Sequence, residues 1–246
     1  IALFIFFLIS NLAALAAAHF IFAGKIGKPS AVSLDFDFWK AQLIQASPLW
    51  LSQLFGIAYL KAAPLILFRL NGEEAVGIYS AGFVIVDGLW IMAGCFVYSI
   101  FPMISRMDEQ EVKRQYLSGL KFITLLFLII AGLVFVAADR IVSLFYSSNF
   151  IPAIPLFRLL AVAAMMVALD TLNSMTIIGI RRQFFLPFIN GAALALNLVL
   201  TLIFVLRIGY TGAAWALIAS EFFVFIAMFL VLNRFLLNRP GVRSIK

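Results

Sequence analysis

Ionisable side chains stand inside runs of hydrophobic residues that a lipid bilayer would solvate poorly. Residues 163–178, AAMMVALDTLNSMTII, contain Asp170, while Asp87, Glu221 and Lys61 lie in other apolar runs. A charge at the bilayer centre costs about 2.5–3.5 kcal/mol on insertion scales, so such residues ordinarily face a bundle interior or a water-filled cavity. These four residues are therefore candidates for binding an ion or a charged substrate.

Uncharged polar residues accompany these charges at helical spacing. Asn173 follows Asp170 by three residues, so the two side chains share a helix face. Asn190 and Asn197 are seven residues apart and point in nearly the same direction. Polar stripes on neighbouring helices predict a wet interior. The alternative is that the asparagines hold helices together through interhelical hydrogen bonds.

Other kinds of chemistry have no support in the sequence. It contains neither a glycine-rich phosphate loop followed by Lys-Ser/Thr nor a G-x-S-x-G elbow. His19 has no ligand at metal-binding spacing, and the lone Cys95 suits a small packing residue. We expect no enzyme activity, no metal and no cofactor. Energy for any transport would come from an ion, the substrate gradient or another subunit.

The composition identifies the elements that must position these residues. Of the 246 residues, 65% are hydrophobic and 12% are charged, and the mean hydropathy is +1.11. The apolar runs are about 20 residues long and lack strand alternation, as expected for helices that cross a bilayer. We predict an all-α integral membrane protein with seven transmembrane helices, at 1–23, 40–69, 76–105, 117–138, 153–178, 184–206 and 211–233.

The basic residues between these helices segregate to one side of the membrane. Three of them fall on one set of connections, namely Arg69, Arg140 and Arg207. Thirteen fall on the other set: Lys25, Lys28, Lys40, Arg106, Lys113, Arg114, Lys121, Arg181, Arg182, Arg234, Arg239, Arg243 and Lys246. The positive-inside rule makes the second side cytoplasmic, including the C-terminal tail. Anionic headgroups account for the net charge of +7, so nucleic acid is not needed as a partner.

Two features bear on domain organisation. The chain begins in a hydrophobic helix without an initiating Met, so we interpret it as a fragment whose N-terminal part is missing. The longest connection, 24–39, mixes charge with Phe36, Phe38 and Trp39. It is either an interfacial hinge between two bundles or a plain surface loop.

Three stretches carry motifs in a recurring order. Residues 73–89, EEAVGIYSAGFVIVDGL, place an acidic turn before a helix start at Val76 and Gly77. Residues 179–221 place Asn197 before the turn GYTGAA and a Ser-Glu pair that ends at Glu221. In their order and spacing these stretches resemble the polysaccharide export proteins of the multidrug/oligosaccharidyl-lipid/polysaccharide flippase superfamily. The third stretch, residues 145–161, FYSSNFIPAIPLFRLLA, looks like an external loop of that family, with Ser where the family usually has glycine.

The resemblance implies two six-helix lobes around a central cavity. Residues 1–23 would be the last helix of the N-terminal lobe, 24–39 the cytoplasmic interlobe linker, 40–233 the C-terminal lobe and 234–246 a cytoplasmic basic tail. It also implies a multi-pass protein of the cytoplasmic (inner) membrane that flips a lipid-diphosphate-linked oligosaccharide, such as an O-antigen repeat unit, by alternating access. Its partners would be this substrate, membrane lipids, a polysaccharide polymerase and glycosyltransferases.

The predicted site follows from this function. Lys61, Arg69 and Arg158 are candidate contacts for the anionic headgroup, and the polar contacts of the cavity would be Asn173, Asn190 and Asn197. Proton or sodium coupling falls to Asp87, Asp170 and Glu221. An ion-coupled multidrug exporter of the same fold would use these acids to attract cations. A non-transporting membrane scaffold is the third possibility, and the number of charges within the spans disfavours it.

Overall fold

The computed structural model describes residues 2–26, 35–104 and 107–238, and all regular elements within these ranges are helical. The chain divides into two compact units, residues 1–45 and 46–246. The first unit contains α1 (Ala2–Ile26) and the start of α2 (Phe36–Ile104). Half of the predicted linker 24–39, residues 27–34, and residues 239–246 of the basic tail lie outside the described residues. The prediction of an all-α membrane protein is confirmed.

The second unit contains the remaining elements. They are the rest of α2, α3 (Glu109–Phe145), the 3-10 helix η1 (Ser148–Ala153), α4 (Ile154–Gly179), α5 (Phe185–Ile208), α6 (Tyr210–Leu232) and the π-helical turn η2 (Asn233–Leu237). Five described helices are long and apolar enough to cross a membrane, and Ile5–Ile21 is a shorter apolar segment. A helix as long as α2 exceeds one crossing of a bilayer about 30 Å thick.

Helix α2 is broken at a single residue. Gly72 has φ 81° and ψ −174°, a backbone conformation that lies outside the helical region and is open essentially to glycine alone. The break separates the segments 36–71 and 73–104. With α2 counted as two segments, the described α-helical segments follow the order of the predicted ones, but the number of long apolar helices is smaller than the seven predicted spans.

Helix α3 is longer than the predicted 117–138 at both ends, and its first turn explains the earlier start. The Asp108 carboxylate accepts a hydrogen bond from the Glu111 backbone N–H at 2.8 Å, and the Glu111 side chain accepts one from the Asp108 N–H at 3.3 Å. This capping box satisfies N–H groups that the start of a helix leaves unpaired. Helix formation therefore extends into the charged segment that the hydrophobic pattern predicts as a loop.

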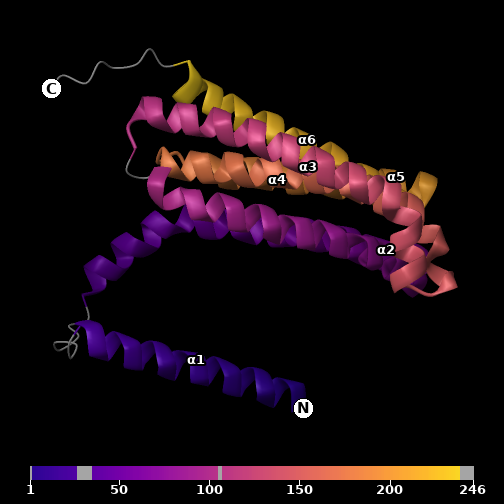
Figure 1. Cartoon of the computed structure of the whole chain (residues 1–246), viewed down its shortest axis with the longest axis horizontal. Helices are drawn as coiled ribbons and strands as arrows, with labels where there is room; N and C mark the ends of the chain where they lie inside the picture. Colours follow the sequence, from indigo (N-terminus) through magenta and orange to yellow (C-terminus); the bar gives the residue numbers. More distant parts are fainter. Residues whose placement is uncertain (1, 27–34, 105–106, 239–246) are drawn as a thin grey trace. The chain divides into compact units, whose positions relative to one another are not determined.

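The helices of the second unit form an antiparallel bundle (Figure 1). Helix α6 packs against both α4 and α5, and α3 packs against α4. The segment 46–71 joins α5, where the Asn190 Nδ2 donates to the Ser52 hydroxyl at 2.8 Å. The segment 73–104 joins α4, where Gly82 leaves room for the side chains of Leu156 and Leu160.

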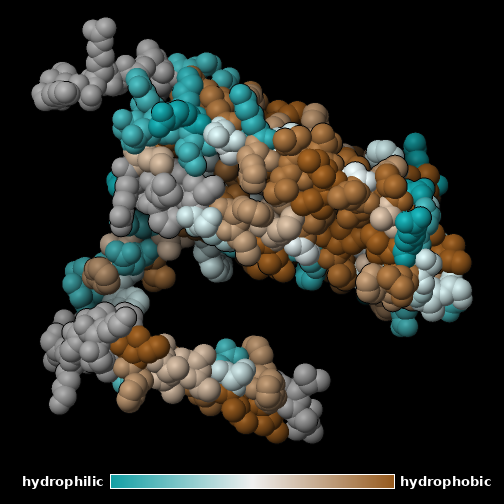
Figure 2. Space-filling view, viewed as in Figure 1, coloured by the Kyte–Doolittle hydropathy of each residue, from teal (hydrophilic) through white to brown (hydrophobic). Residues whose placement is uncertain are grey.

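The bundle has two distinct ends. We call the end formed by 107–114, 179–185 and 233–238 the basic end, and the end formed by 69–74, 140–153 and 207–211 the far end. A hydrogen bond connects different elements at each end. The Lys113 ammonium donates to the Leu237 carbonyl oxygen at the basic end, and the Tyr210 hydroxyl donates to the Pro152 carbonyl oxygen at the far end. Figure 2 shows an apolar belt between the polar surfaces of these ends.

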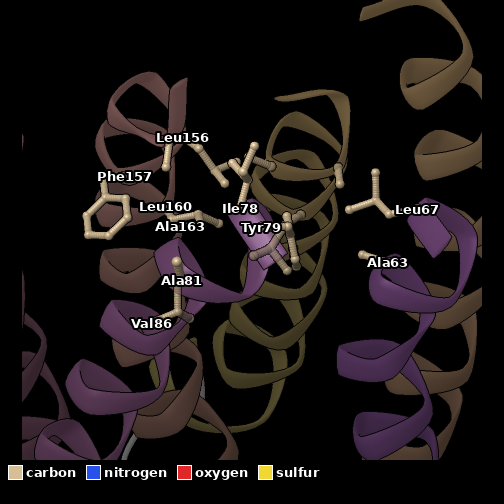
Figure 3. Packing of buried hydrophobic residues seen from close by; sticks show 14 of the residues in the cluster. Ala63, Leu67, Ile78, Tyr79, Ala81, Val86, Leu156, Phe157, Leu160 and Ala163 are labelled. Atoms are coloured by element: carbon tan, nitrogen blue, oxygen red, sulfur yellow. The ribbon is translucent and has the colours of Figure 1, made fainter. Parts of the chain in front are cut away.

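The interior contains two apolar clusters, one behind the other along the bundle. The cluster nearer the far end includes Leu67, Tyr79 and Phe157, and Figure 3 shows Leu156 and Leu160 of α4 beside Ile78 of α2. The cluster nearer the basic end includes Phe127, Ile177 and Leu236. On α6 the two clusters are separated by a stretch that contains Ser220 and Glu221, and on α4 Asp170 lies within the second cluster; these polar residues contribute to the candidate site.

Candidate functional site

Two buried acids lie in the bundle interior, at or beside the cluster nearer the basic end. On α4, Asp170 lies between Leu169 and Leu172 of that cluster; on α6, Glu221 lies between Leu217 of the cluster nearer the far end and Val224 of the other. The two acids are 7% and 6% exposed. Helices α4 and α6 pack along each other, and the two carboxyl groups are near enough in the bundle interior to interact electrostatically.

A tyrosine from a third helix joins this pair. The Tyr59 hydroxyl of α2 interacts with the Glu221 carboxyl group, and it lies 3.5 Å from the Leu217 carbonyl oxygen. Neither carboxyl oxygen of Asp170 has a hydrogen-bond donor among the described residues. The site is therefore built from α2, α4 and α6, and one of its acids has no donor to stabilise a negative charge.

The asparagines bond across helices. The Tyr116 hydroxyl of α3 donates to the Asn173 Oδ1 of α4 at 2.9 Å. The Asn197 Nδ2 of α5 donates to the Ser220 hydroxyl of α6 at 3.3 Å. With the Asn190–Ser52 bond, these contacts connect α3 to α4, α5 to α6, and α2 to α5. Such bonds are the geometry expected of groups that hold helices together.

Two of the predicted charges lie on the surface of the bundle. Lys61 and Asp87 are both on α2, one in each segment, and both are exposed. Lys61 is 11 residues from the break at Gly72, which corresponds to about 16 Å along a helix. Asp87 interacts electrostatically with Tyr79, but it is not among the groups that act on Asp170. Of the three acids predicted to bind an ion, the structure thus brings two together.

The two arginines predicted to bind the headgroup lie toward the far end. Arg69 is exposed, three residues before the break at Gly72. Arg158 forms an ion pair with Asp139, with Nη2 2.6 Å from Oδ2, and its guanidinium stacks over the Phe135 ring. Since Asp139 already balances its charge, Arg158 is less available to an anion than Arg69.

Sequence reasoning missed the tyrosines of this interior. Tyr59, Tyr79 and Tyr116 are buried, and each faces at least one of the two acids. A tyrosine in an apolar run has no pattern that distinguishes a core residue from a site residue. Helical spacing relative to the buried face was the one signal that could have found them.

An apolar groove opens between the first segment of α2 and the start of α5. It encloses about 550 Å³. Its lining is apolar apart from one serine and consists of Ser47, Pro48, Trp50, Leu51, Phe55, Phe184, Pro187, Phe188, Gly191 and Ala192. It lies toward the basic end and is separate from the buried acids.

Long apolar helices with ionisable groups between them define a multi-pass membrane protein. Residues 2–155 match the sequence model of the family described as polysaccharide biosynthesis protein. The match spans more than half of the 246 residues, and the chain belongs to this family, which is of the polysaccharide flippase type. The family resemblance predicted from the sequence is thereby confirmed. No curated protein and no solved structure matches the chain.

Proposed function

We propose that the protein is a flippase that moves a lipid-diphosphate-linked oligosaccharide across the cytoplasmic membrane by alternating access, without a catalytic step of its own. Membership of the polysaccharide biosynthesis family supports the substrate class. The second unit would be one lobe of the transporter, and its basic end would face the cytoplasm, since Lys and Arg concentrate on the inner side of membrane proteins.

The observation that carries the proposal is the position of Lys61. Its side chain is exposed on the bundle surface and lies too deep in the span to reach the far end by extending along the helix. A lysine in contact with lipid at this depth would be costly, so the surface that carries it should border water. A water-filled cavity beside α2 would admit a hydrophilic headgroup while the lipid tail stays in the bilayer.

Within this cavity Lys61 and Arg69 would contact the diphosphate. Both are exposed on the same segment of α2, eight residues apart by their numbers. A phosphate held by a cationic side chain in a partly desolvated cavity gains a charge-assisted hydrogen bond. Asp87, on the other segment, would border the same water rather than bind the anion.

Replacing Lys61 tests the proposal. In vesicles that contain the full-length protein, we expect Lys61→Ala to slow the appearance of lipid-linked glycan headgroups on the far leaflet at least tenfold. Lys61→Arg should recover part of the rate because it restores the charge. Lys121→Ala is the matched control, since Lys121 is exposed on α3 outside this surface. Equal rates for Lys61→Ala and the wild type would remove Lys61 from the headgroup site.

An ion-coupled multidrug exporter of the same fold is the second candidate. The buried acids Asp170 and Glu221 favour it, because an uncompensated acidic site can attract a cationic drug. The two functions differ in the substrate that is transported. Saturable transport of a cationic dye by the vesicles, together with no movement of lipid-linked glycan, would select the exporter.

A further inference from the structure

Two arginine side chains at the basic end gather around one aromatic ring. The guanidinium carbons of Arg182 and Arg234 lie 4.5 and 5.6 Å from the centre of the Phe235 ring. Arg182 belongs to the turn between α4 and α5, and Arg234 belongs to η2 after α6, so the fold brings two positive charges together. Like charges that are close to each other repel, and a bound anion would remove this repulsion. We call these three residues the Phe235 cluster.

No carboxylate of the described residues forms an ion pair with the Phe235 cluster. The ion pair that the described residues do form joins Arg158 to Asp139, toward the far end. At the basic end, Asp108 and Glu111 accept hydrogen bonds from each other's backbone N–H in the capping box of α3. Guanidinium groups suit phosphate because their N–H groups can bond two of its oxygens at once. The cluster therefore favours a phosphate anion.

The apolar groove between α2 and α5 begins beside this cluster. Phe184 lines the groove and follows Arg182 by two residues, and the next residue, Phe185, contacts Phe235 with ring centroids 5.5 Å apart. From Phe184 the lining continues along α5 to Ala192, which corresponds to about 12 Å along a helix. Because α5 starts at the basic end, the groove leads from the level of the arginines into the apolar belt.

Aromatic rings and small residues give the groove its shape. Trp50, Phe184 and Phe188 are large apolar side chains that line the groove and are exposed. The rings of Phe184 and Phe188 pack against each other with centroids 5.1 Å apart. At Gly191 an added Cβ atom would lie 3.2 Å from the Phe55 ring, so this part of the groove has no room for a larger side chain of its own. An apolar slot between rings suits a flexible hydrocarbon chain.

We propose that the groove and the Phe235 cluster together bind one anionic phospholipid from the leaflet at the basic end. The phosphate would lie at Arg182 and Arg234, and one acyl chain would follow the groove between α2 and α5. The charge of the cluster selects an anionic headgroup, and the apolar lining selects the chain. This lipid stays bound, so the proposal does not depend on the proposed function.

The position fits a resident lipid better than the transported substrate. A diphosphate that crosses the membrane must leave each end, whereas both arginines of the cluster are held at the basic end by Phe235. The candidate cations for the substrate headgroup, Lys61 and Arg69, lie further along α2 toward the far end. Lys61 is six residues beyond Phe55, the last residue of α2 that lines the groove.

Native mass spectrometry of the full-length protein tests the headgroup contact. The protein is released from nanodiscs that contain equal amounts of phosphatidylglycerol and phosphatidylcholine, and we expect the wild type to retain one phosphatidylglycerol. A cation near the membrane surface contributes about a fivefold preference for anionic lipid, so the double variant Arg182→Gln, Arg234→Gln should lower this preference about 25-fold. Arg207→Gln is the matched control at an exposed arginine of the far end and should change nothing.

A second variant tests the chain contact in the same measurement. Ala192→Trp should fill the groove and lower the retention of phosphatidylglycerol and phosphatidylcholine alike, because the obstacle is steric. Ala195→Trp is the matched control, since Ala195 is exposed on α5 but does not line the groove. We expect it to retain the lipid as the wild type does.

Several outcomes would overturn the proposal. Unchanged retention in the arginine variant or in Ala192→Trp would do so, as would equal retention of the two lipids by the wild type. Displacement of the phospholipid by an equal amount of a polyprenyl diphosphate would assign the groove to the transported substrate. Variants are compared only if they elute as monodisperse species, and the two variants alter different elements, so one decides if the other does not fold.

The measurement uses no transport, so its failure and that of the proposed function are distinct. A retained phosphatidylglycerol on a protein that moves no lipid-linked glycan would refute the flippase and leave the lipid site. Glycan movement without a retained lipid would do the reverse.

Discussion

A single hydroxyl group joins α3 to the polar interior. The Tyr116 side chain has 0% exposure, and its donation to Asn173 is the only hydrogen bond that the described structure gives this asparagine side chain. In a membrane such bonds average about 0.6 kcal/mol and reach about 1.7 kcal/mol, because the unfolded chain in the membrane also finds partners.

We therefore expect Tyr116→Phe to destabilise the bundle by about 0.6–1.7 kcal/mol. The ring is retained, so the loss reports the hydroxyl alone. Thermal unfolding in detergent, followed by loss of the monodisperse peak, measures the effect. Tyr98→Phe is the control, since that ring is 53% exposed. Equal unfolding temperatures for the two variants would show that the Tyr116 bond adds nothing.

At the scale of elements, glycines decide where the helices turn and how closely they pack. Gly209, with φ 66° and ψ −149°, lies between α5 and α6, and Gly72 plays the same part within α2. Gly212 serves a different purpose. A Cβ atom there would lie 2.4 Å from the backbone carbon and oxygen of Phe204, so α6 meets α5 at a distance that only glycine allows.

Gly212→Ala should destabilise the protein by about 1–3 kcal/mol, the usual range for overpacking, because backbone atoms must move to admit the methyl group. Gly132→Ala is the matched control, since Gly132 is in the interior of α3 and an added methyl group there would have nothing within 4 Å. There alanine should be neutral or favourable by about 0.5–1 kcal/mol. Comparable unfolding temperatures for both variants would contradict the close approach of α5 and α6.

At the scale of the whole molecule, the two ends of the bundle differ in charge. Among the described side chains, the basic residues predicted to face the cytoplasm that lie in the half of the bundle nearer the basic end are Lys113, Arg114, Lys121, Arg181, Arg182 and Arg234. Several are held in place there: the Arg182 guanidinium lies 4.5 Å from the centre of the Phe235 ring. The far end has Glu73, Glu74 and Asp139 beside its arginines.

Cysteine labelling of intact cells checks the orientation. In a Cys95→Ala background, a membrane-impermeant maleimide added outside should react at R207C and not at R181C. Both arginines are exposed, so burial cannot explain a difference between them. After the cells are opened, both positions should react. External labelling of R181C alone would invert the proposed topology.

The amino-acid sequence by itself determined the class of the protein, because membrane insertion depends on the summed hydrophobicity of about 20 residues and not on their partners. The same reasoning found Asp170 and Glu221, since a charge within an apolar run is conspicuous without any structure. Helix boundaries were less accurate where charged residues cap a helix, as Asp108 and Glu111 do for α3.

Only the tertiary structure decided which of these residues meet. Asp87, Asp170 and Glu221 were equivalent in sequence, yet packing of α4 on α6 pairs two of them and leaves Asp87 on the surface. It likewise gave the asparagines partners on other helices and brought Tyr59 to Glu221. The physical reason is that apolar residues surround every helix of a membrane protein, so the sequence pattern of one helix does not specify which face meets its neighbour; close packing and hydrogen bonds between helices specify it.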